Sequence, residues 1–416
     1  MKTIVIFESA QNSGGSTYRA VEMAARITEH KFIFLTFMPL NKIYRDEIPS
    51  RLKTKRIYSL YFDYHASSHI EKFESVFKNK ILRYAFRQLI EATLSFSKLL
   101  IVFQAMLALS SSKVDVVQGN NGVHYLPYWV AKLKGANLFF YFRDLRDFTQ
   151  HPKKIIAAAN QYVFVGKNLM EQYIKQLGLS KTKCIVIHSP FNVEERIQKE
   201  PLYEENPIKA AKESGKKVII CSSRISPAKG QAVILKAYDL IAKSHPDTML
   251  YFVGEADNNA LCTTYLDELN SLIREKKLSN NVCFLGFRKD VLQLTKYADI
   301  AIQAPTYFEA LSGSLVESVQ LGTPTISSDI GGANEVITDG VSGFLFPPGD
   351  FKTLGAIIEH VLNDNEKARA LAEKGKKRAL DQWNPEKMKE LLCNVYEAPH
   401  SNAATPAHQC KNRASE

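Results

Sequence analysis

The strongest constraint on the fold of this chain is an alternation of short β-branched or aromatic runs with longer helical patterns. In the first half, strand-like runs cover residues 3–7, 32–37, 56–61, 114–118, 138–142, 162–165 and 184–188. Helical patterns lie between most of them. Strands that alternate with helices are typical of a parallel sheet built from right-handed crossovers. The first half therefore predicts a doubly wound α/β domain.

The alternation stops near residues 190–215 and then starts again. This region is charged, contains three prolines and has no strand character, which indicates a linker. Beyond it, strands are predicted at 217–221, 249–253, 282–285, 300–303 and 325–327, with helices near 229–243, 262–276, 289–297, 314–321, 351–362 and 366–381. We predict two large domains, 1–195 and 196–380, then a C-terminal helix over 381–398 and a disordered polar tail over 399–416.

The 416 residues carry a formal net charge of +11, and this charge is distributed unevenly. Residues 1–195 hold 27 Lys and Arg against 15 Asp and Glu, whereas residues 196–416 hold 27 against 28. A one-sided basic excess suits an anionic partner, such as a membrane surface, a phosphorylated lipid or a nucleic acid. Basic surface charge that serves solubility alone would explain the same count.

The six cysteines give no sign of disulfides or of a metal site. They form no C-x-x-C pair, and several lie in apolar runs such as VIICSS and NVCFLG. We expect small buried hydrophobic side chains in a reducing compartment. The first residues, MKTIVIFESA, turn polar after a few apolar positions, unlike a signal peptide. A cytoplasmic protein is therefore expected.

The segment of about 70–109 is helical in pattern, basic at its start and strongly apolar at its end. Its longest apolar run, 99–109, is far shorter than the roughly 20 residues that a spanning helix needs. An amphipathic segment of this composition suits interfacial binding to an anionic membrane, which would place the protein peripherally on the cytoplasmic face. A pair of helices packed on the sheet is the alternative.

Ligands of doubly wound domains bind outside the carboxyl ends of the strands and between domains. Gly14 and Gly15 follow the first strand, where glycines let a backbone approach an anion or simply form a turn. Arg224 and Lys229 follow the first strand of the second half. A guanidinium and an ammonium there suit a diphosphate, or they are ordinary surface charges. Gly254 ends the next strand, where it permits a turn or lets a flat ligand lie against the backbone.

The stretch EALSGSLVE places Glu309 and Glu317 eight residues apart around a cluster of small residues. Ser314 and Glu317 fit a capping box, in which a Ser hydroxyl and a Glu three positions later satisfy backbone N–H groups at a helix start. Alternatively, the two acids bind hydroxyls of a ligand whose phosphates rest on that helix start, where unpaired N–H groups favour an anion.

An ordered series of motifs runs through the second half. It consists of Arg224, Lys229-Gly230, FVG, FLGF, E-x7-E, LGTPTISSDIGGANEVITDGVSGFLFPPGD and a closing W…VY. Over about residues 216–396 the chain thus resembles the retaining glycosyltransferases often called family 4 (glycosyl transferases group 1), which have the GT-B fold. The first half matches mainly in its strand order and its Gly-Gly loop.

The resemblance implies two Rossmann-like, doubly wound parallel-sheet domains that face a central cleft. The N-terminal domain would bind the acceptor and the C-terminal domain the nucleotide-sugar donor. The helix at 381–398 would cross back to the N-terminal domain.

The resemblance also implies roles for individual residues. Arg224 and Lys229 would hold the donor diphosphate and stabilise the charge that develops on it. Glu309, the third residue expected to be catalytic, would contact hydroxyls of the transferred sugar, and Glu317 would contact the ribose. The other implied donor contacts are Gly14, Gly15, Gly254, Phe287, Arg288, Ala310, Leu311, Ser312, Gly313, Ser314 and Leu315, with residues 286–288 along the base.

The chain departs from the family on the acceptor side. Many relatives carry a His after the fifth N-terminal strand, where this chain has Arg143 and Asp144. At a second strand end that often bears His, it has Asn120 and, farther on, His124. We expect these four residues on the acceptor side, although an ion pair between Arg143 and Asp144 that holds the loop is an equally simple interpretation. No D-x-D triplet occurs, which agrees with a fold whose members usually need no metal.

The sequence thus predicts a metal-independent, retaining hexosyltransferase without a cofactor. It would move a sugar from a nucleotide-diphosphate sugar to a glycan or lipid-linked acceptor in cell-surface polysaccharide or glycolipid synthesis. Its expected partners are the donor, the acceptor and an anionic membrane surface, with no nucleic acid. A nucleotide-sugar 2-epimerase and a non-catalytic nucleotide-sugar-binding protein are the alternatives.

Overall fold

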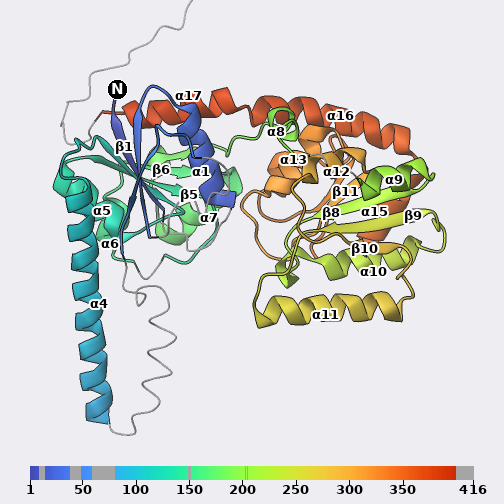
Figure 1. Cartoon of the computed structure of the whole chain (residues 1–416), viewed down its shortest axis with the longest axis horizontal. Helices are drawn as coiled ribbons and strands as arrows, with labels where there is room; N and C mark the ends of the chain where they lie inside the picture. Colours follow the sequence, from blue (N-terminus) through green and yellow to red (C-terminus); the bar gives the residue numbers. More distant parts are fainter. Residues whose placement is uncertain are drawn as a thin grey trace, which may run out of the picture. The chain divides into compact units, whose positions relative to one another are not determined.

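The computed structural model describes residues 1–8, 15–37, 48–58, 80–148, 151–201, 203 and 205–399. Its contacts divide the chain into two units. The first unit comprises 1–141, 150–162 and the end of the chain from Leu391, and the second comprises 142–149 and 163–390. Each unit is described by itself below, and Figure 1 shows the elements by label.

The first sheet has seven strands in the order β3-β2-β1-β4-β5-β6-β7. Its strands are β1 (Thr3–Glu8), β2 (Lys31–Thr36), β3 (Lys53–Arg56), β4 (Val116–Asn120), β5 (Asn137–Phe142), β6 (Gln161–Phe164) and β7 (Cys184–Val186). The helices of this half of the chain are α1 (Gly15–Arg26), α4 (Lys80–Ala108), α5 (Tyr125–Lys134), α6 (Lys153–Ala157) and α7 (Lys167–Leu177), followed by the 3₁₀ turn η1 (Lys181–Lys183). β1 pairs in parallel with both β2 and β4. Its nearly continuous burial is that of a parallel strand covered on both faces.

The end of the chain packs into the first unit through Tyr396. This side chain is 1% exposed, and its hydroxyl donates to Gln118 Oε1 at 2.9 Å. Its ring packs against Phe32 and Phe139. The Lys2 ammonium donates to the Tyr396 carbonyl at 2.8 Å. Tyr396, near the end of the described residues, is therefore part of this unit's core.

The second sheet has six strands in the order β10-β9-β8-β11-β12-β13. Its strands are β8 (Lys217–Ser222), β9 (Thr248–Val253), β10 (Val282–Phe284), β11 (Ile300–Gln303), β12 (Thr325–Ser328) and β13 (Phe344–Phe346). The helices are α8 (Val193–Ile197), α9 (Pro207–Glu213), α10 (Gln231–Ile241), α11 (Ala260–Glu275), α12 (Val291–Tyr297), α13 (Gly313–Leu321), α14 (Ala333–Val336), α15 (Phe351–Asn363), α16 (Asn365–Gln382) and α17 (Pro385–Glu397), with the 3₁₀ turn η2 (Pro227–Lys229) before α10.

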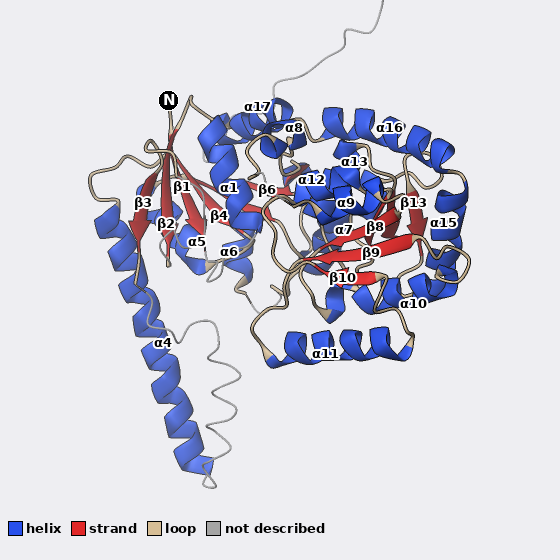
Figure 2. Cartoon of the chain, turned by 45° about the vertical axis from the view of Figure 1, so that its right-hand side comes forward, coloured by secondary structure: helices blue, strands red, loops and turns tan. Residues whose placement is uncertain are grey.

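Successive side chains of β8 enter two separate cores, as expected for a strand covered on both faces. Ile219 and Cys221 pack with α10, α11 and α15. Val218 and Ile220 pack with α9 and α12. Figure 2 shows α10 and α11 on one side of this sheet and α12 and α13 on the other. The two parallel sheets with helices on their faces form the GT-B fold that the motifs predict.

Several predicted elements needed correction. The strand predicted at 56–61 shares only Arg56 with β3, so the prediction is wrong for residues 57 and 58, and residues 59–61 lie outside the described residues. β13 was not predicted, and the predicted linker contains α8 and α9. Within 70–109, the described part is one helix, α4, rather than a pair of helices. In the described part of the chain, no helix is long and apolar enough to span a membrane. The predicted tail lies outside the described residues from residue 400 onward.

Candidate functional site

The loop after β8 presents the first predicted cation, Arg224. The loop is fixed where the Ile225 N–H donates to the Glu255 carbonyl at 2.9 Å. The Arg224 side chain is 68% exposed, and its guanidinium lies 2.8 Å from the Asp257 carboxylate. A well-exposed ion pair is worth only about 0–1 kcal/mol, so an incoming anion can replace Asp257 at little cost.

The second predicted cation, Lys229, is placed by the turn η2. The turn ends at Gly230, whose φ is +68° and where a Cβ would lie 1.9 Å from the Ala304 carbonyl oxygen. Only glycine permits this backbone to come so close to the loop after β11. The approach brings Lys229 Nζ to 2.7 Å from Glu309 Oε1. Two of the three residues expected to be catalytic are therefore in direct contact.

Two glycines after β12 hold the backbone of the Glu309 loop. The Gly332 N–H donates to the Glu309 carbonyl at 2.9 Å. A Cβ on Gly331, whose φ is +61°, would lie 1.9 Å from that same carbonyl oxygen. A Cβ on Gly332 would lie 2.2 Å from the Ala310 carbonyl oxygen. The position of Glu309 thus depends on the absence of side chains at both glycines.

The helix α13 starts two residues earlier than a capping box requires. Its N-cap is Ser312, and the Ser312 side chain makes no capping hydrogen bond. Ser314 lies inside the helix, with its hydroxyl oxygen 3.2 Å from that of Ser312. The capping-box interpretation is therefore wrong, because Glu317 is too far into the helix to bond back to the N-cap. Glu309 lies on the loop and Glu317 on the helix.

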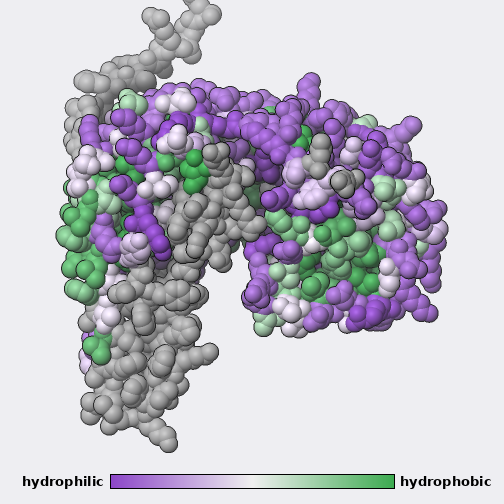
Figure 3. Space-filling model, in the orientation of Figure 1, coloured by the Kyte–Doolittle hydropathy of each residue, from purple (hydrophilic) through white to green (hydrophobic). Residues whose placement is uncertain are grey.

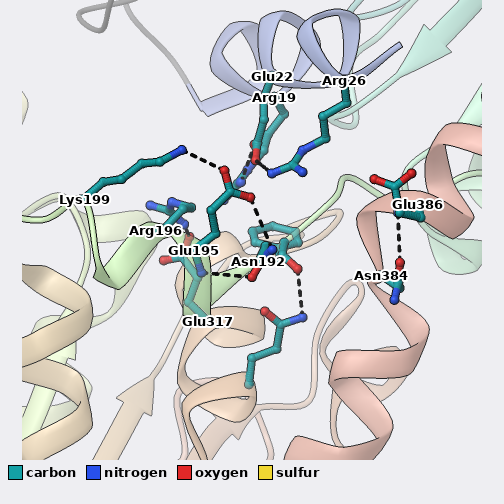
Figure 4. Close-up of polar contacts among 12 residues, drawn as sticks. Arg19, Glu22, Arg26, Asn192, Glu195, Arg196, Lys199, Glu317, Asn384 and Glu386 are labelled. Carbon is teal, nitrogen blue, oxygen red and sulfur yellow. Dashed lines mark hydrogen bonds and ion pairs between the residues drawn. The ribbon is translucent and has the colours of Figure 1, made fainter. Parts of the chain in front are cut away.

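The Glu317 carboxylate is held by a side chain from α8, as Figure 4 shows. The Arg196 guanidinium donates to Glu317 Oε1, and the two side chains are 27% and 14% exposed. The start of α8 is capped by Asn192, whose Oδ1 accepts from the Glu195 N–H at 3.1 Å. Glu195 also pairs with Lys199 at 2.7 Å. A well-formed helix turn thus carries the arginine that orients Glu317.

Several side chains between the two acids belong to the core. Ala310 is 2%, Ser312 7% and Leu315 1% exposed. Leu315 packs in the apolar cluster against α16, and the partly buried Leu311 packs against that cluster. Any ligand contact by these residues would therefore be made by their backbone, whereas Gly313 and Ser314 are partly exposed.

The residues expected along the base are only partly available. Gly254 has φ +138°, in the region that favours glycine, and Phe287 is 51% exposed. Arg288 instead bonds Asp290 at 2.7 Å and lies over the Tyr203 ring, 4.0 Å from its centre. The guanidinium of Arg288 therefore stabilises its own loop.

Asp144, after β5, belongs to the electrostatic environment of the Lys229–Glu309 pair. Burial raises the pKa of the Asp144 carboxyl, the Glu309 carboxylate raises it further and the Lys229 ammonium opposes the rise. The Arg143 guanidinium donates to the Ser189 hydroxyl at 2.8 Å. An acidic group with a raised pKa near these charges is suited to a polar ligand contact.

The other predicted residues lie in the first unit. Asn120 is buried at the end of β4, and its amide donates to the Glu8 carboxylate at 2.6 Å. The Asn121 amide donates to the other Glu8 oxygen at 3.3 Å. Gly15 is the exposed first residue of α1, whereas Gly14 lies outside the described residues. Glu8, which the sequence did not single out, is the acid around which this strand end is organised.

His124 has a structural role. It is the N-cap of α5, and its Nδ1 accepts from the Leu126 N–H at 3.2 Å. Its ring packs on Phe7, with 4.6 Å between ring centres. Burial lowers the pKa of His124 to about 3, with smaller contributions from His151 and Lys98. The imidazole is therefore neutral at physiological pH.

Glu335 is a further acid that the sequence did not single out. Its carboxylate accepts from the Lys167 and Asn168 N–H groups at the start of α7, each at 2.8 Å. A Cβ on Gly166 would lie 2.9 Å from Glu335 Oε1. The only sequence signal for this contact is the acid that follows the double glycine in IGGANEV. Among the residues that the structure describes, no group of three or more His, Cys, Asp or Glu side chains could hold a metal ion.

Comparison with known proteins shows what this part of the chain is similar to. Residues 203–378 match the family model described as glycosyl transferases group 1. Over these residues the chain is similar to the glycosyl transferases group 1. The spore coat protein SA of Bacillus subtilis is 30% identical over 191 residues, which are 44% of this chain and 49% of that protein. The GDP-mannose-dependent monoacylated alpha-(1-6)-phosphatidylinositol monomannoside mannosyltransferase of Corynebacterium glutamicum is 30% identical over 189 residues, 44% of this chain and 47% of that protein. The chain thus spans about half the length of the curated relatives it matches.

Solved structures extend the similarity in fold to nearly the whole chain. The Anabaena protein HepE, solved in complex with UDP, has a TM-score of 0.71 at 19% identity, over 95% of this chain and 99% of that chain. A glycosyltransferase from Rickettsia africae has a TM-score of 0.75 at 18% identity, over 95% of this chain and 98% of that chain. At these identities the similarity supports the GT-B fold alone, whereas the match of residues 203–378 to the family model carries the functional argument.

Proposed function

We propose that this protein is a retaining glycosyltransferase that moves a hexose-type sugar from a nucleotide-diphosphate sugar to a glycan or lipid-linked acceptor. The observation that carries the proposal is the Lys229–Glu309 contact of 2.7 Å, made at the carboxyl ends of β8 and β11. This edge of a doubly wound sheet is where ligands bind. The match to the family model, which spans both residues, supports the same chemistry.

The charged side chains of the site would bind different parts of the donor. Lys229 and Arg224, with the N-terminus of α13, would bind the diphosphate and stabilise the negative charge that develops on it as the glycosidic bond breaks. Glu309 would accept hydrogen bonds from sugar hydroxyls, and Glu317, oriented by Arg196, would accept them from the ribose. The acceptor oxygen would attack the face that the diphosphate leaves, and its proton would pass to a leaving phosphate oxygen. No protein nucleophile is required, so catalysis rests on positioning and charge.

Two donor classes are proposed from what the relatives and solved structures are described to bind or use. HepE was solved with UDP, and the Corynebacterium relative is described as GDP-mannose-dependent. The relatives also include a capsular polysaccharide biosynthesis glycosyltransferase of Staphylococcus aureus, 23% identical over 175 residues. Cell-surface glycan or glycolipid synthesis is therefore the proposed context, with a peripheral location on the cytoplasmic face of the membrane.

A panel of UDP and GDP sugars, followed by NMR with and without glycan acceptors, tests the proposal. Slow hydrolysis of one donor, and transfer with the anomeric configuration retained, is the expected result. Epimerisation of the nucleotide sugar without an acceptor would show that the protein is an isomerase and not a transferase. Binding of a donor without turnover would indicate a non-catalytic binding protein. Activity is expected to persist in EDTA, and its loss would refute metal independence.

A further inference from the structure

The helix α4 exposes large apolar side chains along one side. Leu89, Phe96, Leu99, Phe103 and Leu107 are between 58% and 65% exposed. At 3.6 residues per turn, these five positions fall within an arc of about 80° over a length of roughly 27 Å. Isolated apolar side chains at a surface need no explanation, whereas a continuous stripe indicates an interaction site.

The opposite side of α4 holds the helix on the first unit. Ser97, Ile101 and Ala105 are at most 3% exposed, and they lie roughly opposite the apolar stripe. The Gln104 amide also exchanges two hydrogen bonds with the backbone of Tyr58, at 3.0 and 3.1 Å. One side of α4 therefore packs on the first unit, and the opposite side exposes the apolar stripe to solvent.

The neighbouring helix α5 extends the exposed surface with an amphipathic group. Trp129 and Leu133, one turn apart, are 37% and 54% exposed. The Lys132 ammonium lies 5.1 Å from the centre of the Trp129 ring. Figure 3 shows apolar side chains gathered over α5 and the adjoining part of α4. Tryptophan beside lysine is typical of side chains that lie between an apolar phase and water.

The charged side chains that the structure describes in these two helices are all positive. They are Lys98 in α4 and Lys132 and Lys134 in α5. The edge strand β3, which ends two residues before Tyr58, adds the exposed Lys53, Lys55 and Arg56. A second copy of this surface would bring like charges together, whereas an anionic lipid surface complements both the cations and the apolar stripe.

We propose that the α4–α5 surface, formed by the apolar stripe of α4 with Trp129 and Leu133, binds the interface of an anionic lipid bilayer. The apolar side chains enter the region between headgroups and acyl chains, and the lysines contact the lipid phosphates. The proposal names the surface and its lipid partner from exposure and charge, and it does not depend on which sugar nucleotide the second unit binds.

Flotation of the full chain with phosphatidylcholine vesicles, with and without phosphatidylglycerol, tests this inference. Binding is expected only with phosphatidylglycerol, and it should weaken as salt is raised. The double variant Phe96→Ser with Phe103→Ser should weaken binding on the order of 100-fold, because it removes two large apolar groups. Lys53→Glu with Lys55→Glu should weaken it about tenfold or more.

The matched control is Leu261→Ser with Leu240→Ser, which alters exposed apolar side chains of the second unit, 68% and 53% exposed. This control should bind vesicles like the unaltered chain. All variants should keep the unaltered circular dichroism spectrum and the rate of donor turnover without vesicles, which shows that the fold is intact. Equal binding to vesicles without phosphatidylglycerol, or no binding at all, would overturn the proposal. A dimer that the Phe96 and Phe103 changes dissolve would also overturn it, in favour of a second copy.

Discussion

The substitution Gly331→Ala should displace Glu309 and lower turnover, beyond any effect that it has on the stability of the fold. A Cβ there would lie 1.9 Å from the Glu309 carbonyl oxygen, whereas real Cβ contacts essentially never fall below 3.0 Å. The Glu309 loop must therefore move by about 1.1 Å in Gly331→Ala. A misplacement of about 1 Å at a catalytic group can cost about 100-fold in rate, equivalent to about 2.7 kcal/mol of transition-state stabilisation.

Gly340→Ala is the control that isolates this effect. Gly340 has φ +66°, close to the +61° of Gly331, but a Cβ there would meet nothing within 4 Å. Both variants should lose about 1–2 kcal/mol of stability to the left-handed backbone conformation. Only Gly331→Ala also displaces the loop, so only it should lose turnover.

The assay is the initial rate of nucleotide diphosphate release from the donor that the panel identifies, normalised to folded protein by circular dichroism. Gly331→Ala should lower kcat by about 100-fold, while Gly340→Ala should stay within about threefold of the unaltered enzyme. A Gly331→Ala enzyme with unaltered kcat would refute the claim that this glycine places Glu309. An equal loss of kcat in both variants would show that backbone strain alone lowers turnover.

Three further predictions concern single side chains. Lys229→Ala should lower kcat by about 100- to 1,000-fold with the fold retained. The control Lys236→Ala, at an exposed position of α10, should leave kcat unchanged. A fully active Lys229→Ala enzyme would refute the assignment of Lys229 to the diphosphate. Arg196→Met should weaken binding of the free nucleoside diphosphate measured by calorimetry, because Glu317 loses its orientation. Lys199→Met, in the turn that follows α8, should bind normally. The pKa of His124 in the folded chain is about 3, so below about pH 6.5 the unfolded chain binds one more proton than the folded chain. The free energy of unfolding therefore decreases as the pH is lowered. His124→Asn keeps the N-cap acceptor and should reduce the stability lost between pH 6.5 and 5.5 by about 1 kcal/mol in urea unfolding, and an unchanged loss would contradict a neutral buried His124.

The extent to which the sequence predicts this fold depends on how each strand is covered. β1 and β8 are buried on both faces, so they read as continuous apolar runs and were predicted to within a residue or two. β3 consists of Lys53, Thr54, Lys55 and Arg56, all exposed at a sheet edge, and hydrophobic periodicity cannot detect such a strand. β13 was missed for a different reason, because its three residues are too few for a pattern.

In the candidate site, too, some residues could be predicted from the sequence and others could not. Lys229 and Glu309 could be predicted because each follows a strand within a recognisable motif. The contacts of Arg196 with Glu317 and of Glu335 with the start of α7 join residues more than 100 positions apart, and no local pattern records them. The acceptor-side prediction for His124 did not include its contact at the start of α5, where its Nδ1 accepts from the Leu126 N–H.

The spacing of the two acids follows from how the polypeptide reaches α13. Glu309 lies on a loop whose carbonyl is fixed by the Gly332 N–H, so its side chain turns toward Lys229. Glu317 lies in the helix, beyond the first turn, where Arg196 holds it. The N–H groups of Gly313 and Ser314, at the helix start, fall between the two carboxylates along the chain. A ligand with a sugar at one end, a nucleoside at the other and a diphosphate between them presents its groups in this same order, which a free phosphate or a simple sugar does not.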